Sequence, residues 1–290
     1  MYLSFHLCKT RCLSSKSGRV LGKGQMPVSD VWLTPKPYKE SRWWKVSSTA
    51  ILMIVAACGK VLIGCFNKPT IHRREAFMRC VTKRPANKPL ITVSNHYSMV
   101  DDFLISYLLP WKFLFKRTGV RWMPGAKDVC CKNLATSLFF QLGRVVPVVR
   151  GDGVYQQSMD FCVDRLSEGD WINIYPEGKV NCDKEFMRLK WGVGRLIADS
   201  EVSPIVLPIW HLGMEDFYPT KKPYYPRIGK KITVVVGNPL DFENDVKMLR
   251  EQNKTEEEVR KYITDKIQDV FLTLKTETEL LHSQSDDRNS

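Results

Sequence analysis

The chain has 290 residues, of which 43% are hydrophobic and 26% are charged. A chain of this length can bury about three quarters of its unfolded surface, which excludes a mini-protein held together by disulfides. A mean hydropathy of -0.25 excludes a bundle of membrane-spanning helices. The net charge of +13 draws the protein to polyanions, whether nucleic acid, anionic lipid surfaces or phosphorylated substrates.

Residues 1–28 contain five basic residues, several serines and no acidic residue. This composition is typical of a mitochondrial targeting segment, although short basic tails also arise by chance and Met26 could equally be the functional start. We therefore treat 1–45 as a basic N-terminal tail with a candidate targeting segment. Without those five charges the net charge of +13 would still be +8, so the body of the protein is basic too.

Residues 46–66 form an apolar run whose only charge is Lys60. About 20 apolar residues are just long enough to cross a bilayer, so this segment is predicted to be a membrane-anchoring helix. The alternative is a buried core helix. Spanning and interfacial arrangements are both open, and we favour the interfacial one, with Lys60 reaching the headgroups. Aromatic and basic anchors flank the run, namely Trp43, Trp44, Lys45 and Lys68.

From Pro85 onward, strand-like and helix-like segments alternate. Strands are predicted over 90–95, 144–150, 171–176, 205–210 and 231–237, and helices over 99–109, 154–166, 186–198 and 256–281. This alternation predicts a single α/β domain over 67–290, with a mostly parallel central sheet flanked by helices. The last helix is amphipathic, with an apolar face of Val259, Ile263, Ile267, Val270, Phe271 and Leu274.

The nine cysteines are scattered, without a C-x-x-C pair and without histidines at zinc-ligand spacing. They are expected to be reduced thiols. No metal site and no cofactor is predicted.

His96 and Asp101 lie in the run NHYSMVDD, directly after the first predicted strand. In one continuous helix they would be about 140° apart and could not meet. A strand-to-helix turn with His96 before the helix lets Asp101 hold one ring nitrogen while the other faces substrate, which gives a general base for a hydroxyl. The alternative is a turn histidine capped by neighbouring aspartates.

A second group of polar residues follows other predicted strands. Glu177, Gly178 and Lys179 come directly after the strand WINIYP, and Arg150 ends the strand RVVPVVR. Open α/β sheets bind ligands at the carboxyl ends of their strands, so these residues are candidates for substrate binding. A plain β-turn with solvated charges and a surface arginine are the alternatives.

Taken together, these motifs resemble those of the glycerolipid acyltransferases. NHYSMVD fits the N-H-x-x-x-x-D box of that family, YPEG resembles its F-P-E-G box, IVLPIW resembles its apolar strand with a central proline, and Arg150 matches the arginine of its second box. Their order along the chain also agrees. Longer segments, such as YPEGKVN and PIVLPIWHLGM, resemble the branch of the family that exchanges acyl chains between phospholipids and lysophospholipids in mitochondria.

The resemblance implies an acyltransferase that works without coenzyme A, with His96 as base and Asp101 as its orienting partner. Asp102 is then structural. It implies that Arg150, Glu177 and Gly178 bind the polar head or shape the site, with Lys179 standing where the family usually has Thr-Arg. The implied partners are phospholipids and lysophospholipids, with cardiolipin among the phospholipids, and a membrane surface. No nucleic acid is implied, and an oligomer is possible.

The implied location is a mitochondrial membrane facing the intermembrane space, with peripheral or monotopic attachment. An acyl-CoA-dependent enzyme with the same pair of residues is the first alternative. A basic membrane-binding or nucleic-acid-binding protein without activity is the second, although no nucleic-acid-binding module is recognisable in the sequence. No G-x-S-x-G motif occurs, which disfavours a serine hydrolase.

Overall fold

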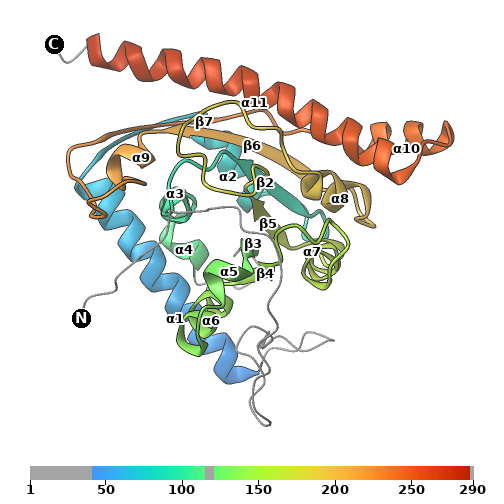
Figure 1. Cartoon of the computed structure of the whole chain (residues 1–290), viewed down its shortest axis with the longest axis horizontal. Coiled ribbons are helices and arrows are strands. Elements are labelled where there is room, and N and C mark those ends of the chain that lie inside the picture. Colours follow the sequence, from blue (N-terminus) through green and yellow to red (C-terminus); the bar gives the residue numbers. More distant parts are fainter. Residues whose placement is uncertain (1–40, 115–120, 288–290) are drawn as a thin grey trace, which may run out of the picture.

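The computed structural model describes residues 41–114 and 121–287 (Figure 1). The candidate targeting segment therefore lies outside the described residues. The core of the fold is a five-stranded sheet with the strand order β1-β7-β6-β2-β5. Its strands are β1 (Lys68–His72), β2 (Leu90–Ser94), β5 (Trp171–Ile174), β6 (Ile205–Leu212) and β7 (Lys231–Val236).

The central strand β2 is buried along its whole length, as expected for a parallel strand covered on both faces. It pairs in parallel with β5 on one side, Leu90 opposite Trp171, and with β6 on the other, Leu90 opposite Ile205. The sheet is thus mostly parallel, as predicted. The exception is β7, which runs antiparallel to β6. The chain returns after β6 through a loop with one short helix, α9 (Met214–Phe217), rather than through a crossover helix that would restore the parallel direction.

A two-stranded parallel ribbon lies beside the edge strand β5. It consists of β3 (Met123–Ala126) and β4 (Val145–Val148), which pair in register from Met123 opposite Val145. Trp122 joins this ribbon to β5, because its backbone N–H donates to Trp171 O and its carbonyl accepts from Asn173 N, each at 2.8 Å. The carboxyl ends of β2, β3, β4 and β5 therefore point the same way.

Alternate side chains of the strands enter two cores, one on each face of the sheet. Ile91 and Val93 of β2 belong to the core under α7 (Gln157–Ser167), α8 (Gly192–Ala198) and α11 (Glu256–Asp287). Leu90 belongs to the core under α2 (Arg74–Thr82) and α3 (Asp101–Leu108). Four further helices are α4 (Trp111–Leu114), α5 (Lys127–Cys130), α6 (Leu134–Leu142) and α10 (Glu243–Glu251).

The long C-terminal helix confirms the predicted amphipathic pattern. It crosses one face of the sheet (Figure 1) and buries Val259, Ile263, Ile267 and Phe271 to 2% exposure or less. The helix predicted over 186–198 is wrong in its first half, because α8 begins only at Gly192. The residues from Phe186 to Lys190 form no regular secondary structure and are held by long-range hydrogen bonds, from Leu189 N to Gln268 Oε1 and from Lys190 N to Pro176 O. These tertiary bonds outweigh the local helical preference.

The apolar run predicted as an anchor forms α1 (Arg42–Gly59) and continues as a π-helix, η2 (Lys60–Cys65). It is the one helix in the described ranges that is long and apolar enough to cross a membrane. It also packs on the domain. A Cβ at Gly59 would come within 2.7 Å of Phe103 O, which shows how closely α1 approaches α3.

The expectation that Lys60 reaches lipid headgroups is wrong. Its ammonium donates to Tyr107 O at 3.1 Å and to Leu109 O at 2.6 Å. These carbonyls lie at the end of α3, where a positive charge is favourable. Lys60 also lies over the rings of Tyr107 and Trp111. The charge is therefore satisfied inside the protein and joins η2 to α3.

Candidate active site

His96 lies in the turn that leaves the carboxyl end of β2. The preceding residue, Asn95, is fully buried and fixes this end of the strand. Its amide donates to His211 O at 3.0 Å and accepts from His211 N at 2.9 Å. Because His211 lies on β6, these two hydrogen bonds hold the turn against the neighbouring strand. His96 therefore begins from a rigid point of the sheet.

The structure brings the side chains of His96 and Asp101 together. Nδ1 of His96 lies 2.9 Å from Oδ2 of Asp101, which is the first residue of α3. The same oxygen accepts the backbone N–H groups of Tyr97 and Ser98, each at 2.9 Å. Three N–H groups converge on one carboxylate oxygen, and these hydrogen bonds hold the buried Asp101 side chain in place. The turn conformation also removes the 140° separation that a continuous helix would impose.

This arrangement fixes the tautomer of His96. A carboxylate only accepts, so Nδ1 carries the proton and Nε2 is left with a free lone pair. The ring stacks on Tyr175, with the ring centroids 4.4 Å apart and the planes inclined by 17°. Burial, followed by the nearby charges of Asp102 and Asp101, raises the pKa of Tyr175, which keeps its phenol neutral. The side chain of His96 is 21% exposed, so the imidazole is held in place yet accessible.

The Pro-Glu-Gly turn after β5 holds the backbone of His96 from both sides. Oε1 of Glu177 accepts His96 N at 2.9 Å, and Asn181 N donates to His96 O at 2.7 Å. Gly178 has a φ of 71°, and a side chain there would meet Lys190. A glycine is favoured at this position because L side chains rarely adopt a left-handed conformation. The turn therefore positions the histidine that the strand presents.

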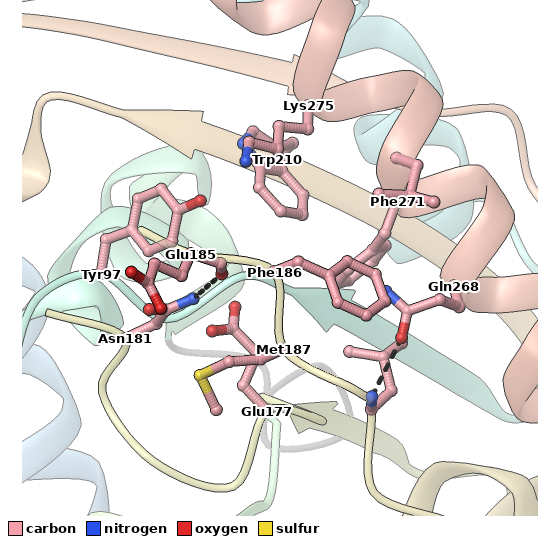
Figure 2. A pocket seen from close by; sticks show the side chains of 12 residues that line it. Tyr97, Glu177, Asn181, Glu185, Phe186, Met187, Trp210, Gln268, Phe271 and Lys275 are labelled. Carbon is pink, nitrogen blue, oxygen red and sulfur yellow. Dashed lines mark hydrogen bonds between the residues drawn. The ribbon is translucent and has the colours of Figure 1, made fainter. Parts of the chain in front are cut away.

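Glu177 also lines a pocket of about 390 Å³, including its open mouth, between this turn and α11 (Figure 2). The walls are mainly apolar, and Tyr97 borders it next to His96. Glu177 is 3% exposed, and its Oε2 has no hydrogen-bond partner among the described residues. The apolar walls are Phe186, Met187, Leu189, Trp210, Phe271 and Leu272.

Burial raises the pKa of Glu177, although the His96 N–H and the Asn181 side chain act in the opposite direction. A raised pKa means that folding disfavours the carboxylate, so stability is lost as the pH rises through the folded-state value. We expect Glu177→Gln to be at least as stable as the original protein at pH 7. The difference should vanish near pH 4, below the ordinary pKa of glutamate. Urea unfolding at both pH values measures this.

Glu177→Ala serves as the matched comparison. It removes the acceptor for His96 N–H, and we expect it to lower the free energy of unfolding by roughly 1–3 kcal/mol. If Glu177→Gln were less stable than the original protein at pH 7 but equal at pH 4, the raised pKa would be contradicted.

The other sequence candidates lie at the same edge of the sheet without contacting the pair. Arg150 follows the end of β4, is half exposed and forms an ion pair with Asp128 at 3.1 Å. Within the described ranges, no hydrogen bond or ion pair joins it to His96 or Glu177. Lys179 is exposed in the turn after Glu177. The structure therefore groups His96, Asp101 and Glu177, and leaves Arg150 and Lys179 as exposed charges outside this group.

Asp102 points away from His96 and pairs with Arg121, whose side chain is 4% exposed. This pair ties the start of α3 to the residue just before Trp122 and the β3–β4 ribbon. The neighbouring aspartates thus have different partners.

His211 is the residue of this site that the sequence reasoning did not single out. It is 1% exposed, and its Nε2 lies 3.1 Å from Asn95 O and 3.6 Å from Asp101 Oδ2. A carbonyl only accepts, so Nε2 carries the proton and its positive edge faces the Asp101 carboxylate. The only signal in the sequence is its place one residue after IVLPIW.

The family model Acyltransferase matches residues 70–212, the stretch that contains His96, Asp101 and the Pro-Glu-Gly turn. The protein is an acyltransferase. The fold agrees, because the 1-acyl-sn-glycerophosphate acyltransferase PlsC of Thermotoga maritima superposes with a TM-score of 0.54 at 17% identity, over 81% of this chain and 84% of that one.

Similar proteins indicate which kind of acyltransferase the chain resembles. The chain is 44% identical to tafazzin of Drosophila melanogaster over 89% of its own length and 68% of that protein. It is 38% identical to N-acylphosphatidylethanolamine synthase of Arabidopsis thaliana over 71% of its length and 74% of that protein. A tafazzin of Saccharomyces cerevisiae is 28% identical over 73% of this chain and 67% of that protein. The chain therefore belongs to the glycerolipid acyltransferase family and carries the tafazzin type of sequence.

Proposed function

We propose that this acyltransferase is a transacylase that moves acyl chains between phospholipids and lysophospholipids, cardiolipin among them, without coenzyme A. The observation that carries the proposal is the His96–Asp101 pair, in which Nδ1 faces the Asp101 carboxylate and the partly exposed imidazole is held at the end of β2. The similarity to tafazzins supports the lipid classes. The net charge of +13 suits a phosphate-rich membrane surface.

In the proposed reaction, His96 Nε2 accepts the proton of a free hydroxyl on the lysophospholipid. The hydroxyl oxygen attacks the ester carbonyl carbon of the donor phospholipid and forms a tetrahedral intermediate. The imidazolium is stabilised by the Asp101 carboxylate while it exists. It then returns the proton to the departing glycerol oxygen of the donor. The acceptor becomes a phospholipid, the donor becomes a lysophospholipid, and no water is consumed.

The remaining residues have supporting roles in this proposal. Glu177 positions His96 by accepting its backbone N–H, and Gly178 allows the turn that makes this hydrogen bond. The second carboxylate oxygen of Glu177, Oε2, accepts a substrate hydroxyl in this proposal. Arg150 and Lys179 are exposed cations near the rim and attract the lipid phosphate, with Arg150 exchanging its ion pair with Asp128 for the headgroup.

A donor-exchange assay tests the reaction. The purified protein is given a phospholipid with a labelled acyl chain and an unlabelled lysophospholipid in liposomes, with no acyl-CoA present. Labelled acceptor should form at the rate at which labelled donor loses its chain, and His96→Ala should abolish it. If label moves only when acyl-CoA is supplied, the enzyme is acyl-CoA-dependent. If no donor supports transfer, the proposed activity fails.

We further propose that residues 67–290 form the acyltransferase domain and that α1 and η2 anchor this domain to one face of a mitochondrial membrane. The domain then lies on the side of the intermembrane space. The targeting-like composition of 1–28 supports the organelle. The packing of α1 on α3 supports an interfacial position, since a spanning α1 would carry α3 into the hydrocarbon. One side of α1 is buried against the domain, with Ser48, Leu52, Ala56 and Gly59 inside.

Protease protection distinguishes the two arrangements. Tags are placed before Trp43 and after His282, and the protein is bound to the outside of sealed vesicles. For an interfacial helix we expect both tags to be digested from outside. Protection of one tag alone would establish a spanning helix.

A further inference from the structure

Helix α6 has its polarity reversed relative to a helix on the surface of a water-soluble domain. Its polar residues Ser137 and Gln141 are 0% and 2% exposed. Its apolar residues Leu134, Leu138 and Phe139 are 59%, 40% and 45% exposed. A surface helix normally turns its apolar stripe to the core and its polar stripe to water.

The reversal is specified by contacts and is not a defect of packing. Gln141 Nε2 donates to Ser137 Oγ at 2.8 Å, one helical turn away, so the buried polar side chains satisfy each other. Asn133 caps the helix, accepting Thr136 N at 2.9 Å, and Thr136 returns the bond to Asn133 N. The helix is therefore well formed and presents leucine and phenylalanine outward.

Helix α6 is in contact with α1, which also exposes apolar side chains. The two helices lie side by side near the start of α1 (Figure 1), where Ser48 Oγ donates to Leu142 O at 2.7 Å. Along α1 and η2, the outward residues are also apolar, including Trp43, Val46, Ile54 and Val61. Neither helix contains an acidic residue. Two helices in contact thus each expose several large apolar side chains, more than the single exposed residues that are ordinary on soluble proteins.

We propose that α6 is a second membrane-inserting element, which enters the headgroup–acyl boundary of a phospholipid bilayer beside α1. This inference rests on the proposed anchoring by α1 and extends it to a part of the chain more than 60 residues further on. Basic residues at the starts of the two helices, Arg42, Lys45 and Lys132, suit anionic lipid headgroups at the rim of the surface. An aromatic residue at this boundary, such as Trp43, is typical of interfacial helices.

The arrangement also explains how the bilayer meets the active site. Helix α1 packs on α3, which begins at Asp101. In the chain, α6 follows β3 and precedes β4, and the carboxyl ends of these two strands point the same way as that of β2. Insertion of both helices fixes the orientation of the domain about two axes, whereas α1 alone would leave it free to roll. The site can then draw both lipids laterally from one leaflet.

The test uses the full chain with Leu138→Asp and Phe139→Asp combined. The control combines Met248→Asp and Leu280→Asp, which are 39% and 57% exposed on α10 and α11. Binding is measured by co-sedimentation with vesicles of phosphatidylcholine and phosphatidylglycerol. We expect the α6 variant to bind about 30-fold more weakly than the control. Transfer between short-chain lipids dispersed below their aggregation threshold should be unchanged, because neither residue belongs to the catalytic site.

Amide hydrogen exchange of 134–142 supplies a second readout that does not depend on substitutions. Vesicles should slow the exchange of this segment in the original protein. Equal vesicle binding by the α6 and control variants, or equal exchange with and without vesicles, would overturn the inference while leaving anchoring by α1 intact. A failure of the original protein to bind vesicles would instead overturn the proposed anchoring as well. Loss of a lipid-free dimer, with vesicle binding unchanged, would identify the surface as a contact between copies.

Discussion

Replacing His96 with alanine is expected to lower the turnover of acyl transfer by about 100- to 10,000-fold, the usual contribution of a general base. The imidazole of His96 is partly exposed and lies in a turn, so its removal leaves the packing of the two cores intact. Vesicle binding and the unfolding midpoint should therefore change little. Transfer of a labelled acyl chain between two defined lipids at saturating concentrations measures the effect.

His72→Ala is the matched control for this experiment. His72 ends β1, at the far edge of the sheet from β2 and β5. Its replacement should leave turnover within about twofold. Near-normal turnover in the His96 variant, with a folded protein, would remove His96 from the role of base and with it the proposed reaction.

Asp101→Asn is expected to lower turnover by about 100-fold or more, whereas Asp102→Asn should change it by less than about tenfold. An amide oxygen at position 101 can still accept the three N–H groups that converge there, so the turn survives. The negative charge that stabilises the imidazolium is lost. Comparing the two variants in the same transfer assay separates a charge effect from a structural one.

Asp102→Asn should act on stability. It leaves the buried guanidinium of Arg121 without its carboxylate partner, which we expect to lower the free energy of unfolding by roughly 1–3 kcal/mol. Urea unfolding of both variants provides this second readout. Equal losses of turnover, or a larger loss in the Asp102 variant, would show that the partner of the histidine has been misassigned.

Features that depend on neighbouring residues could be derived from the sequence. Four strands of the main sheet, all except β1, were predictable from short β-branched runs, as was β4 of the ribbon. Helix α11 was predictable from apolar residues three and four apart. The His96–Asp101 contact was also accessible, because five residues and one turn separate the two side chains and the strand-to-helix change leaves few alternatives. The Pro-Glu-Gly turn was recognisable, since proline and glycine restrict the backbone locally.

Features that depend on contacts across the chain required the tertiary structure. The bonds of His211 to Asn95 and the stacking of Tyr175 on His96 join residues about 80 to 116 positions apart. The direction of β7 depends on a loop that could have led either way. The position of the Lys60 ammonium likewise depends on carbonyl groups at the end of α3, more than 45 residues away in the sequence.

The alternation of strands and helices and the chemical character of the motifs follow from local sequence, because propensity and hydrophobic periodicity act over a few residues. Long-range contacts determine which polar groups meet, that α6 exposes its leucines, and that residues 186–190 are not helical. In each of these cases a partner that is distant in sequence supplies a hydrogen bond or an apolar surface. Such a contact outweighs a local preference worth only a few tenths of a kcal/mol per residue, about the size of helix propensities.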